Sequence, residues 1–326
     1  MKKLLTGLQP SGELTLGSLI GGISGSVKNQ DIYDSYIFVP DMHAITVEQD
    51  PILLKERIRK NVALYIACGL DPNKNTFYIQ SENLYHANLS WILECHTYIG
   101  EASRMTQFKE KSKNKENISV GLFTYPILMA ADILLYDADL VPTGIDQKQH
   151  VELARNLAIR FNNKYGETFK LPEPMIPEIG AKIKDLQEPT KKMSKSSDSY
   201  KGTILLLDPE EVIRKKIMSA VTDSEGKVYY DVENKPGISN LLTIYSALKN
   251  ISIKQTEEYF KDYNYGSLKK EVADIVVEKL TTIQNKYNEI INSNLIDEVL
   301  DKGISKMNEL AKIKYEEVRN KVGFGR

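Results

Sequence analysis

The sequence predicts an α/β fold, in which a parallel β-sheet is covered by helices on both faces, followed by a C-terminal α-helical domain. Short apolar segments bounded by turn residues alternate with helical segments over the first part of the 326 residues, and this alternation is typical of parallel sheets. After Leu207, helical patterns dominate to the end of the chain. We therefore predict a first domain at residues 1–207 and an α-helical domain at 208–326.

Three short strands are expected in the first quarter of the chain. They span residues 3–8, 35–39 and 76–79, with helical segments between them. The helix after the first strand should begin at residue 17 or 18 and continue towards 29. Ligands of such sheets bind beyond the carboxyl ends of the strands, which is where this chain places Gln9, Asp41 and His43.

The second helix has clear boundary signals. Asp50 is a typical N-cap, Pro51 follows at the first helical position, and Gly69 closes the helix. Residues 86–136 are also rich in helical patterns and are unusually apolar. That surface would bury either core or a partner subunit, and we favour a homodimer formed through a helical insertion at about residues 80–135.

The rest of the chain completes the expected sheet and the helical domain. A strand is expected at residues 140–142, a helix at 146–162, and an irregular crossing at 172–177. Asp208, followed by proline, should cap the first helix of the second domain. The clearest amphipathic helix begins near Ser267, and we expect the last helix to pack back on the first domain.

Composition places the chain among ordinary soluble proteins. Hydrophobic residues make up 41% and charged residues 27% of the sequence. No apolar run is long enough to span a membrane, and the N-terminus lacks the pattern of a signal peptide, so we expect a cytoplasmic protein. Cys68 and Cys95 lie far apart without a metal-binding spacing, so we expect neither a structural metal nor an iron–sulfur cluster.

The net charge of −1 is weak evidence against a nucleic-acid partner, because nucleic-acid-binding domains are usually basic. Two segments are locally basic. Residues 109–115 carry four lysines and one glutamate, and residues 182–195 carry five lysines and two acids. Such patches are either solvated loops or contacts for phosphate groups.

The turn at residues 7–18 has the features of an anion-binding site. A strand, a turn rich in glycine and proline, and a helix start together present backbone N–H groups and the positive end of the helix. Thr15 and Ser18 add hydroxyl groups, and Gly17 would let an adenine ring approach the backbone. The turn matches neither a dinucleotide fingerprint nor a Walker loop, and a turn without a ligand is the alternative.

The segment at residues 192–196 carries two ammonium groups on a serine-containing loop. Lys192 and Lys195 could converge on one polyphosphate and close on it as charge develops. Taken alone, this segment reads as a basic surface turn. Combined with the turn at residues 7–18, it predicts a single ATP site.

Together these motifs resemble those of the class I aminoacyl-tRNA synthetases. Residues 15–18 stand at the place of the HIGH signature, and residues 192–196, Lys-Met-Ser-Lys-Ser, are identical to the KMSKS signature. The resemblance narrows to the bacterial type of the tryptophanyl-tRNA synthetase family, and it covers essentially the whole chain. Further segments that carry it are residues 7–12, 41–46, 104–109, 125–134, 144–150 and 220–224.

The resemblance implies a Rossmann-like catalytic domain with an ATP site. Lys192 and Lys195 would hold the departing pyrophosphate with help from Lys111, and Thr15 would act as the first residue of the HIGH signature. Gly144, Ile145 and Asp146 would contact the ribose, and Ile183 would lie beside the adenine. The remaining ATP contacts would be Gln9, Pro10, Ser11, Gly17, Ser18, Met193, Ser194 and Ser196.

The resemblance also implies an amino-acid pocket. Asp132 would accept the indole N–H of tryptophan, while Gln147 and Tyr125 would hold its ammonium group. The walls of the pocket would be formed by Met129, His43, Val141 and Leu5. Each assignment has a structural alternative: Asp132 as a buried acid that caps backbone groups, His43 as a structural histidine, and Tyr125 as plain core.

The implied reaction is the ligation of L-tryptophan to tRNA(Trp). ATP, with Mg²⁺, would activate the amino acid as its adenylate and release pyrophosphate, and tryptophan would then pass to the 3′-terminal ribose. Because a buried Asp132 left without an N–H partner is costly, phenylalanine should be rejected on the order of 10⁴-fold. The helical domain would read the anticodon.

Some positions depart from the family pattern. Thr15 and Ser18 replace the histidines of the HIGH signature, Leu5 stands where relatives often have phenylalanine, and residues 197–199 replace the usual Asp-Pro. Three rival interpretations remain at this point: a tyrosyl-tRNA synthetase, a small-molecule nucleotidylyltransferase, and a non-catalytic RNA-binding or regulatory paralogue.

Overall fold

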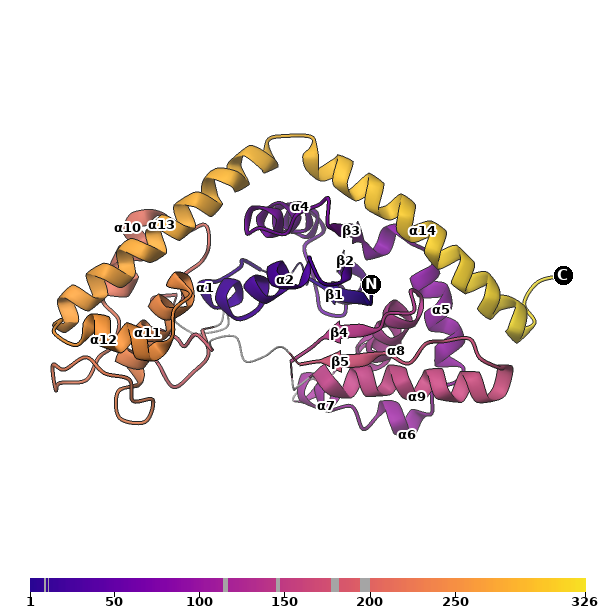
Figure 1. The fold of residues 1–326 in the computed structure, drawn as a ribbon. Coiled ribbons are helices and arrows are strands. Elements are labelled where there is room, and N and C mark those ends of the chain that lie inside the picture. Colours follow the sequence, from indigo (N-terminus) through magenta and orange to yellow (C-terminus); the bar gives the residue numbers. More distant parts are fainter. Residues whose placement is uncertain (9, 11, 114–116, 145–146, 177–181, 194–199) are drawn as a thin grey trace.

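The computed structural model describes residues 1–326 except 9, 11, 114–116, 145–146, 177–181 and 194–199. Its described part contains a five-stranded parallel sheet in the order β3-β2-β1-β4-β5. The strands are β1 Lys3–Gly7, β2 Asp34–Val39, β3 Asn75–Ile79, β4 Leu140–Pro142 and β5 Glu173–Met175. Helices follow the strands along the chain, so the predicted α/β class is confirmed (Figure 1).

The helices have the following bounds: α1 Leu16–Ser18, a π-helical turn Leu19–Ile23, α2 Ser24–Asn29, α3 Asp41–Ala44, α4 Pro51–Ala67, a 3₁₀ turn Gln80–Glu82, α5 Tyr85–Glu94, α6 Ile99–Ala102, α7 Thr106–Ser112, α8 Val120–Leu134, α9 Lys148–Tyr165, α10 Glu210–Met218, α11 Pro236–Lys249, α12 Ile253–Phe260, α13 Tyr265–Ile291 and α14 Leu295–Val322. The predicted helix start at Asp50 is confirmed, because its side chain accepts hydrogen bonds from the backbone N–H groups of Ile52 and Leu53.

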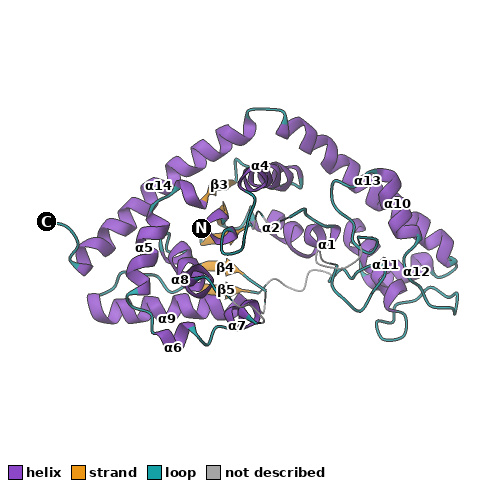
Figure 2. Cartoon of the chain, turned by 180° about the vertical axis from the view of Figure 1, so that it is seen from behind, coloured by secondary structure: helices purple, strands orange, loops and turns teal. Residues whose placement is uncertain are grey.

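Both faces of the sheet are buried. Along β2, Tyr36 and Phe38 point to the cluster formed with α5, α8 and α9, whereas Ile37 and Val39 point to the cluster formed with α4. This alternation follows from the two-residue period of a strand. Seen from behind, α4 lies on one side of the strands, and α8 and α9 lie on the other (Figure 2).

One predicted loop is a strand. Residues 172–177 were expected to cross irregularly, but Glu173–Met175 pair in parallel with β4 as β5. The sequence pattern is misleading because Pro174 has no N–H to donate. A proline is compatible with the outermost strand of a sheet, and β5 holds that position.

A second expectation is also wrong in its detail. The helix α10 begins after Pro209 as predicted, but Asp208 does not cap it. The Asp208 carboxylate instead accepts hydrogen bonds from the backbone N–H of Leu205 (2.9 Å) and from Lys216 Nζ (2.7 Å). Asp208 therefore ties the start of the helical region to the segment that precedes it.

The helices α13 and α14 form a long arch over the molecule (Figure 1). The helix α13 packs on α10, α11 and α4, and α14 returns across β3 and α5. One hydrophobic cluster accordingly contains residues from 14–70 and from 183–300. The packing therefore joins elements on both sides of residue 207, where we place the domain boundary.

The contact between α14 and β3 leads to a stability prediction. A Cβ atom at Gly303 would lie 1.7 Å from the backbone oxygen of Phe77, so Gly303→Ala should lower the free energy of unfolding by roughly 2–4 kcal/mol. A Cβ atom at Gly25 in α2 would meet no atom within 4 Å. The control Gly25→Ala should be neutral or stabilising by about 0.5–1 kcal/mol. Urea unfolding of both variants measures this difference, and equal stabilities would contradict the close packing.

Candidate functional site

The two signature segments lie side by side. The backbone N–H of Leu16 donates to Ile204 (2.9 Å), and that of Leu206 donates to Leu14 (2.9 Å). Thr15 and Leu205 form an antiparallel bridge between these hydrogen bonds. The segment at residues 204–206, which follows the KMSKS segment, is therefore bonded directly to the turn that contains the HIGH-like residues.

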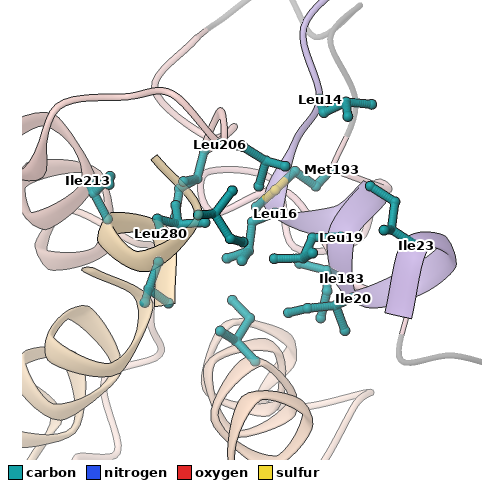
Figure 3. Packing of buried hydrophobic residues seen from close by; sticks show 14 of the residues in the cluster. Leu14, Leu16, Leu19, Ile20, Ile23, Ile183, Met193, Leu206, Ile213 and Leu280 are labelled. Carbon is teal, nitrogen blue, oxygen red and sulfur yellow. The ribbon is translucent and has the colours of Figure 1, made fainter. Parts of the chain in front are cut away.

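Gly17 and Met193 bring the two segments into contact from the other side. A Cβ atom on Gly17 would lie 3.4 Å from Met193 Cβ and 3.5 Å from its carbonyl oxygen. The Met193 side chain is buried in the cluster that also holds Leu16 and Leu19 (Figure 3). The turn and the start of the KMSKS segment are thus in contact, and a shared ATP site remains a prediction.

Thr15 fixes the start of α1. Its side-chain oxygen accepts a hydrogen bond from the backbone N–H of Ser18 (3.1 Å), and the two hydroxyl groups are also 3.1 Å apart. Thr15 is only 2% exposed. Its observed role is to cap the helix, while the backbone N–H of Leu16 at the same helix start is bonded to Ile204.

Lys192 stands at the edge of the described part of the KMSKS segment. It is exposed and pairs with Lys184 in an antiparallel bridge. Lys184 is held in turn by the Asn240 side chain, which binds its backbone N–H (2.8 Å) and its carbonyl (2.9 Å). The base of the loop is therefore fixed to α11, and the Lys192 ammonium group is open to solvent.

Other predicted ATP contacts have mixed positions. Pro10 is buried and Gly144 is exposed, while the Ile183 side chain lies in the hydrophobic cluster. Only the backbone of Ile183 could therefore lie beside a nucleotide. The remaining predicted ATP contacts fall outside the described residues; they are Gln9, Ser11, Ile145, Asp146, Ser194, Lys195 and Ser196.

Asp132 is the centre of a buried hydrogen-bond cluster. It lies on α8 and is 0% exposed. One carboxylate oxygen, Oδ1, accepts from Gln80 Nε2 (2.7 Å) and from His86 Nδ1 (2.7 Å), and the other, Oδ2, lies 2.8 Å from His43 Nε2. These partners are side chains, so Asp132 does not serve as a cap for backbone groups.

The surroundings of Asp132 keep it ionised. Burial by itself raises the pKa of this carboxyl group, but hydrogen bonds and charge interactions with His43 and His86 more than offset that effect. The resulting pKa is about 2, below the ordinary value of 3.8. At neutral pH, Asp132 is therefore a negatively charged acceptor of hydrogen bonds.

A row of side chains leads from Asp132 towards the helix α7. The rings of His43 and Tyr125 meet edge to face, with centroids 6.1 Å apart, and Lys111 Nζ lies 4.9 Å from the centre of the Tyr125 ring. The Tyr125 hydroxyl group also bonds to His150 Nε2 at 3.1 Å. Burial is the main cause that raises the pKa of Tyr125 to about 12. Tyr125 thus remains a neutral phenol.

The other predicted wall residues lie at the sheet. Leu5 and Val141 are buried on the adjacent strands β1 and β4, and Met129 packs on the same cluster. Gln147 begins α9, and its backbone N–H donates to Gly144 (3.0 Å). The structure thus places Leu5, Val141 and Met129 in one hydrophobic cluster, on β1, β4 and α8.

Gln80 and His86 were missed as partners of Asp132. A signal existed for Gln80, because it follows β3 directly at the carboxyl end of the sheet. His86 carries no such signal: it lies inside α5, and only the packing of α5 against α8 brings it to Asp132.

Within the described residues, no group of three or more His, Cys, Asp or Glu side chains could hold a metal ion. Cys68 and Cys95 are free thiols, and burial raises the pKa of Cys68 to about 12. In the same part of the chain, no helix combines the length and apolar character needed to cross a membrane.

Comparison with known proteins gives consistent matches. The family of class I tRNA synthetases (W and Y) matches residues 1–281. A tryptophan–tRNA ligase from Bacillus anthracis is 49% identical over 326 residues, which cover 100% of this chain and 99% of that protein. One from Bacillus subtilis is 52% identical over 323 residues, which cover 99% of this chain and 98% of that protein.

Solved structures match over the whole chain as well. The tryptophanyl-tRNA synthetase of Mycoplasma pneumoniae has a TM-score of 0.89 at 38% identity, covering 100% of this chain and 98% of its own. The enzyme of Campylobacter jejuni, complexed with ADP and tryptophan, has a TM-score of 0.87 at 35% identity, covering 99% and 100%. A tyrosyl-tRNA synthetase from Archaeoglobus fulgidus, with a TM-score of 0.65 at 24% identity over 88% and 90%, shares the fold.

Proposed function

Because the chain belongs to the class I tRNA synthetases for tryptophan and tyrosine, we propose how its residues carry out amino-acid activation. The reaction is that of a tryptophan–tRNA ligase, the name carried by relatives that are 49% and 52% identical to this chain over nearly its whole length. L-Tryptophan and ATP form tryptophanyl-adenylate and pyrophosphate, and tryptophan is then transferred to tRNA(Trp). The observation that carries the choice of substrate is the buried, ionised Asp132 with Oδ2 facing His43.

Asp132 recognises the indole ring in this proposal. The indole N–H is a donor without an acceptor, so it matches a carboxylate that stays charged. The indole N–H competes with His43 for Oδ2, and the ring lies against Met129 and Val141. Phenylalanine has no N–H for this oxygen, which leaves Asp132 underbonded and explains its rejection.

In this proposal the ammonium group of tryptophan and the phosphates of ATP both bind near Tyr125. Tyr125 and Gln147 hold the ammonium group of tryptophan, and Lys111, placed over the Tyr125 ring, reaches the phosphates of ATP. Lys192 and Lys195 bind the leaving pyrophosphate, and Mg²⁺ enters as part of the ATP substrate. The tryptophan carboxylate attacks the α-phosphorus in line, so the protein supplies position and positive charge and no nucleophile.

The helical domain binds the anticodon of the tRNA in this proposal, through bases that are splayed and stacked. The reaction takes place in the cytoplasm, where ATP and tRNA are available. We further propose that residues 7–18 and 192–196 form one ATP site, which is supported by the contact of Met193 with Gly17 and by the hydrogen bonds of residues 14–16 with residues 204–206.

A homodimer is part of the proposal. Trp91 is 62% exposed on α5, and Leu84 is exposed one heptad before it. Tyr98, Ile99 and Val120 add exposed apolar side chains on or beside α6 and α8. Contiguous exposed apolar patches often mark protein–protein interfaces, and we propose that these side chains form such an interface.

We expect Trp91→Glu to convert a dimer into monomers, because a charge would be buried without a partner. Sedimentation velocity of the wild type and the variant measures the change. Ile313 on α14 is also exposed, at 71%, and Ile313→Glu is the matched control that should remain dimeric. A monomeric wild type would remove the dimer from the proposal.

The function is tested by amino-acid-dependent exchange of pyrophosphate into ATP, measured with all twenty amino acids in the absence of tRNA. Exchange with tryptophan alone is the expected result. Exchange with tyrosine would keep the family and overturn the substrate. No exchange with any amino acid would favour a non-catalytic paralogue.

A further inference from the structure

The partners of Asp132 differ in how accessible they are. Gln80 and His86 both bond to Oδ1, and both are completely buried. His43, the neighbour of Oδ2, has a side chain that is 14% exposed. An incoming ligand can therefore compete with His43 at Oδ2, whereas Oδ1 is already occupied by side chains that water does not reach.

His86 is itself held in place from its far side. Its Nε2 atom lies 2.9 Å from the hydroxyl oxygen of Tyr136, which accepts a hydrogen bond from Asn83 Nδ2 (2.9 Å). The amide of Asn83 also reaches the carbonyl oxygen of Met307 on α14 (3.4 Å). All three side chains, those of His86, Tyr136 and Asn83, are at most 2% exposed.

The groups at the two ends of this hydrogen-bond network determine which group donates and which accepts at each step. Asn83 Nδ2 can only donate, so the Tyr136 oxygen is an acceptor there and its own proton is free to be donated to His86 Nε2. A neutral His86 that accepts at Nε2 must carry its proton on Nδ1, which faces Asp132 Oδ1. Each donor thus fixes the next one along the path Asn83, Tyr136, His86 and Asp132.

We propose that His86 is a positioning residue for tryptophan recognition: it holds Asp132 through Oδ1 and thereby presents Oδ2 to the indole N–H. This proposal rests on the proposed function, because it assumes that Asp132 receives tryptophan. Tyr136 and Asn83 support His86 and do not touch the ligand. The hydrogen-bond network begins on α14, so the last helix contributes to the shape of the amino-acid pocket.

The direct test replaces His86 with two residues. His86→Leu removes both hydrogen bonds, and we expect the KM for tryptophan to rise by about 10–100-fold while kcat changes much less. His86→Asn retains an N–H near the position of Nδ1, and it should restore most of the affinity. Tyr136→Phe should raise KM by less than His86→Leu, since it removes only the support.

A pH profile separates positioning from packing. The titratable groups around Asp132 are His43 on α3, His86 on α5, Tyr78 on β3 and Tyr136 after α8. Without His86, burial raises the pKa of Asp132 with less opposition. In His86→Leu, kcat/KM for tryptophan should then fall on the acid side at a higher pH than in the wild type, because the protonated carboxyl group is a poorer acceptor.

The control is Tyr36→Phe. Tyr36 is as buried as Tyr136, and its hydroxyl group bonds to Asp34 (2.8 Å) away from the network. It should leave the KM for tryptophan unchanged. If His86→Leu fails to fold, the KM for tryptophan and the pH profile of Tyr136→Phe and His86→Asn test the positioning role instead.

Three results would overturn the positioning role: a wild-type KM in His86→Leu, a wild-type KM in Tyr136→Phe when His86→Leu does not fold, or equal effects of Tyr136→Phe and Tyr36→Phe. All assays include wild-type exchange with tryptophan. Its absence would reject the proposed function, whereas an active wild type with unaffected variants would reject only the role of His86.

Discussion

Asp132→Asn is expected to lower kcat/KM for the activation of tryptophan by about 10²–10⁴-fold. The substitution replaces one acceptor oxygen by an NH₂ group within a cluster in which Gln80 and His86 already donate to Oδ1. If the NH₂ group takes the place of Oδ1, it faces the donors Gln80 and His86. If it takes the place of Oδ2, it faces the indole N–H, so one acceptor is lost in either orientation. The fall should be accompanied by a smaller preference for tryptophan over phenylalanine, measured by exchange with each amino acid.

Asp139→Asn is the matched control for this experiment. Asp139 is a largely buried carboxyl group whose pKa is also lowered, despite the opposing effect of burial, by hydrogen bonds from Lys170 and from the backbone of Lys3. It does not belong to the Asp132 cluster. We expect Asp139→Asn to affect stability and to leave tryptophan selectivity unchanged. Unchanged selectivity in Asp132→Asn would mean that Asp132 does not recognise the indole N–H.

Lys192→Ala should slow adenylate formation by about 10²–10³-fold and leave tryptophan binding nearly unchanged. Lys192 is exposed at the start of the KMSKS loop, and its neighbour Met193 packs on Gly17 at the turn. An ammonium group in this place acts on the charge that develops on pyrophosphate, and it contributes little to the binding of the amino acid. Single-turnover formation of the adenylate and the KM for tryptophan measure the two effects separately.

Lys191→Ala removes the same charge one residue earlier. Lys191 forms an ion pair with Glu188, so it is engaged on the surface and should be nearly silent in both assays. Similar losses in the two variants would indicate that only the overall positive charge of the loop matters. A parallel loss of tryptophan binding in Lys192→Ala would contradict a role in the transition state.

The candidate site was predicted from the sequence to different depths. The family resemblance assigned Asp132, Tyr125 and His43 to the amino-acid pocket and Lys111 to the ATP phosphates, and the structure brings these four side chains together in one row. The assignment of each role remains a prediction. Several of the ATP contacts, including Lys195, lie outside the described residues.

The sequence by itself determined what depends on near neighbours along the chain. The continuous apolar run of residues 36–39 indicates a strand with two buried faces, and Asp50 with Pro51 indicates the start of α4, because these patterns act over a few residues. The turn at 7–18 and the KMSKS segment were likewise recognised as local motifs. Their chemistry could be inferred from the sequence without the distance between the two segments.

Only the tertiary structure decided the contacts between residues that are far apart in sequence. Asp132 bonds to His43, which is 89 residues away in sequence, and to His86, which is 46 residues away. The strand β5 pairs with β4, although the proline at position 174 favours a loop in the sequence. Asp208 turns back to Leu205 and Lys216 instead of capping α10. A polar side chain bonds to whichever partner the packed helices and strands bring within reach, and that choice is made by the burial of distant apolar faces.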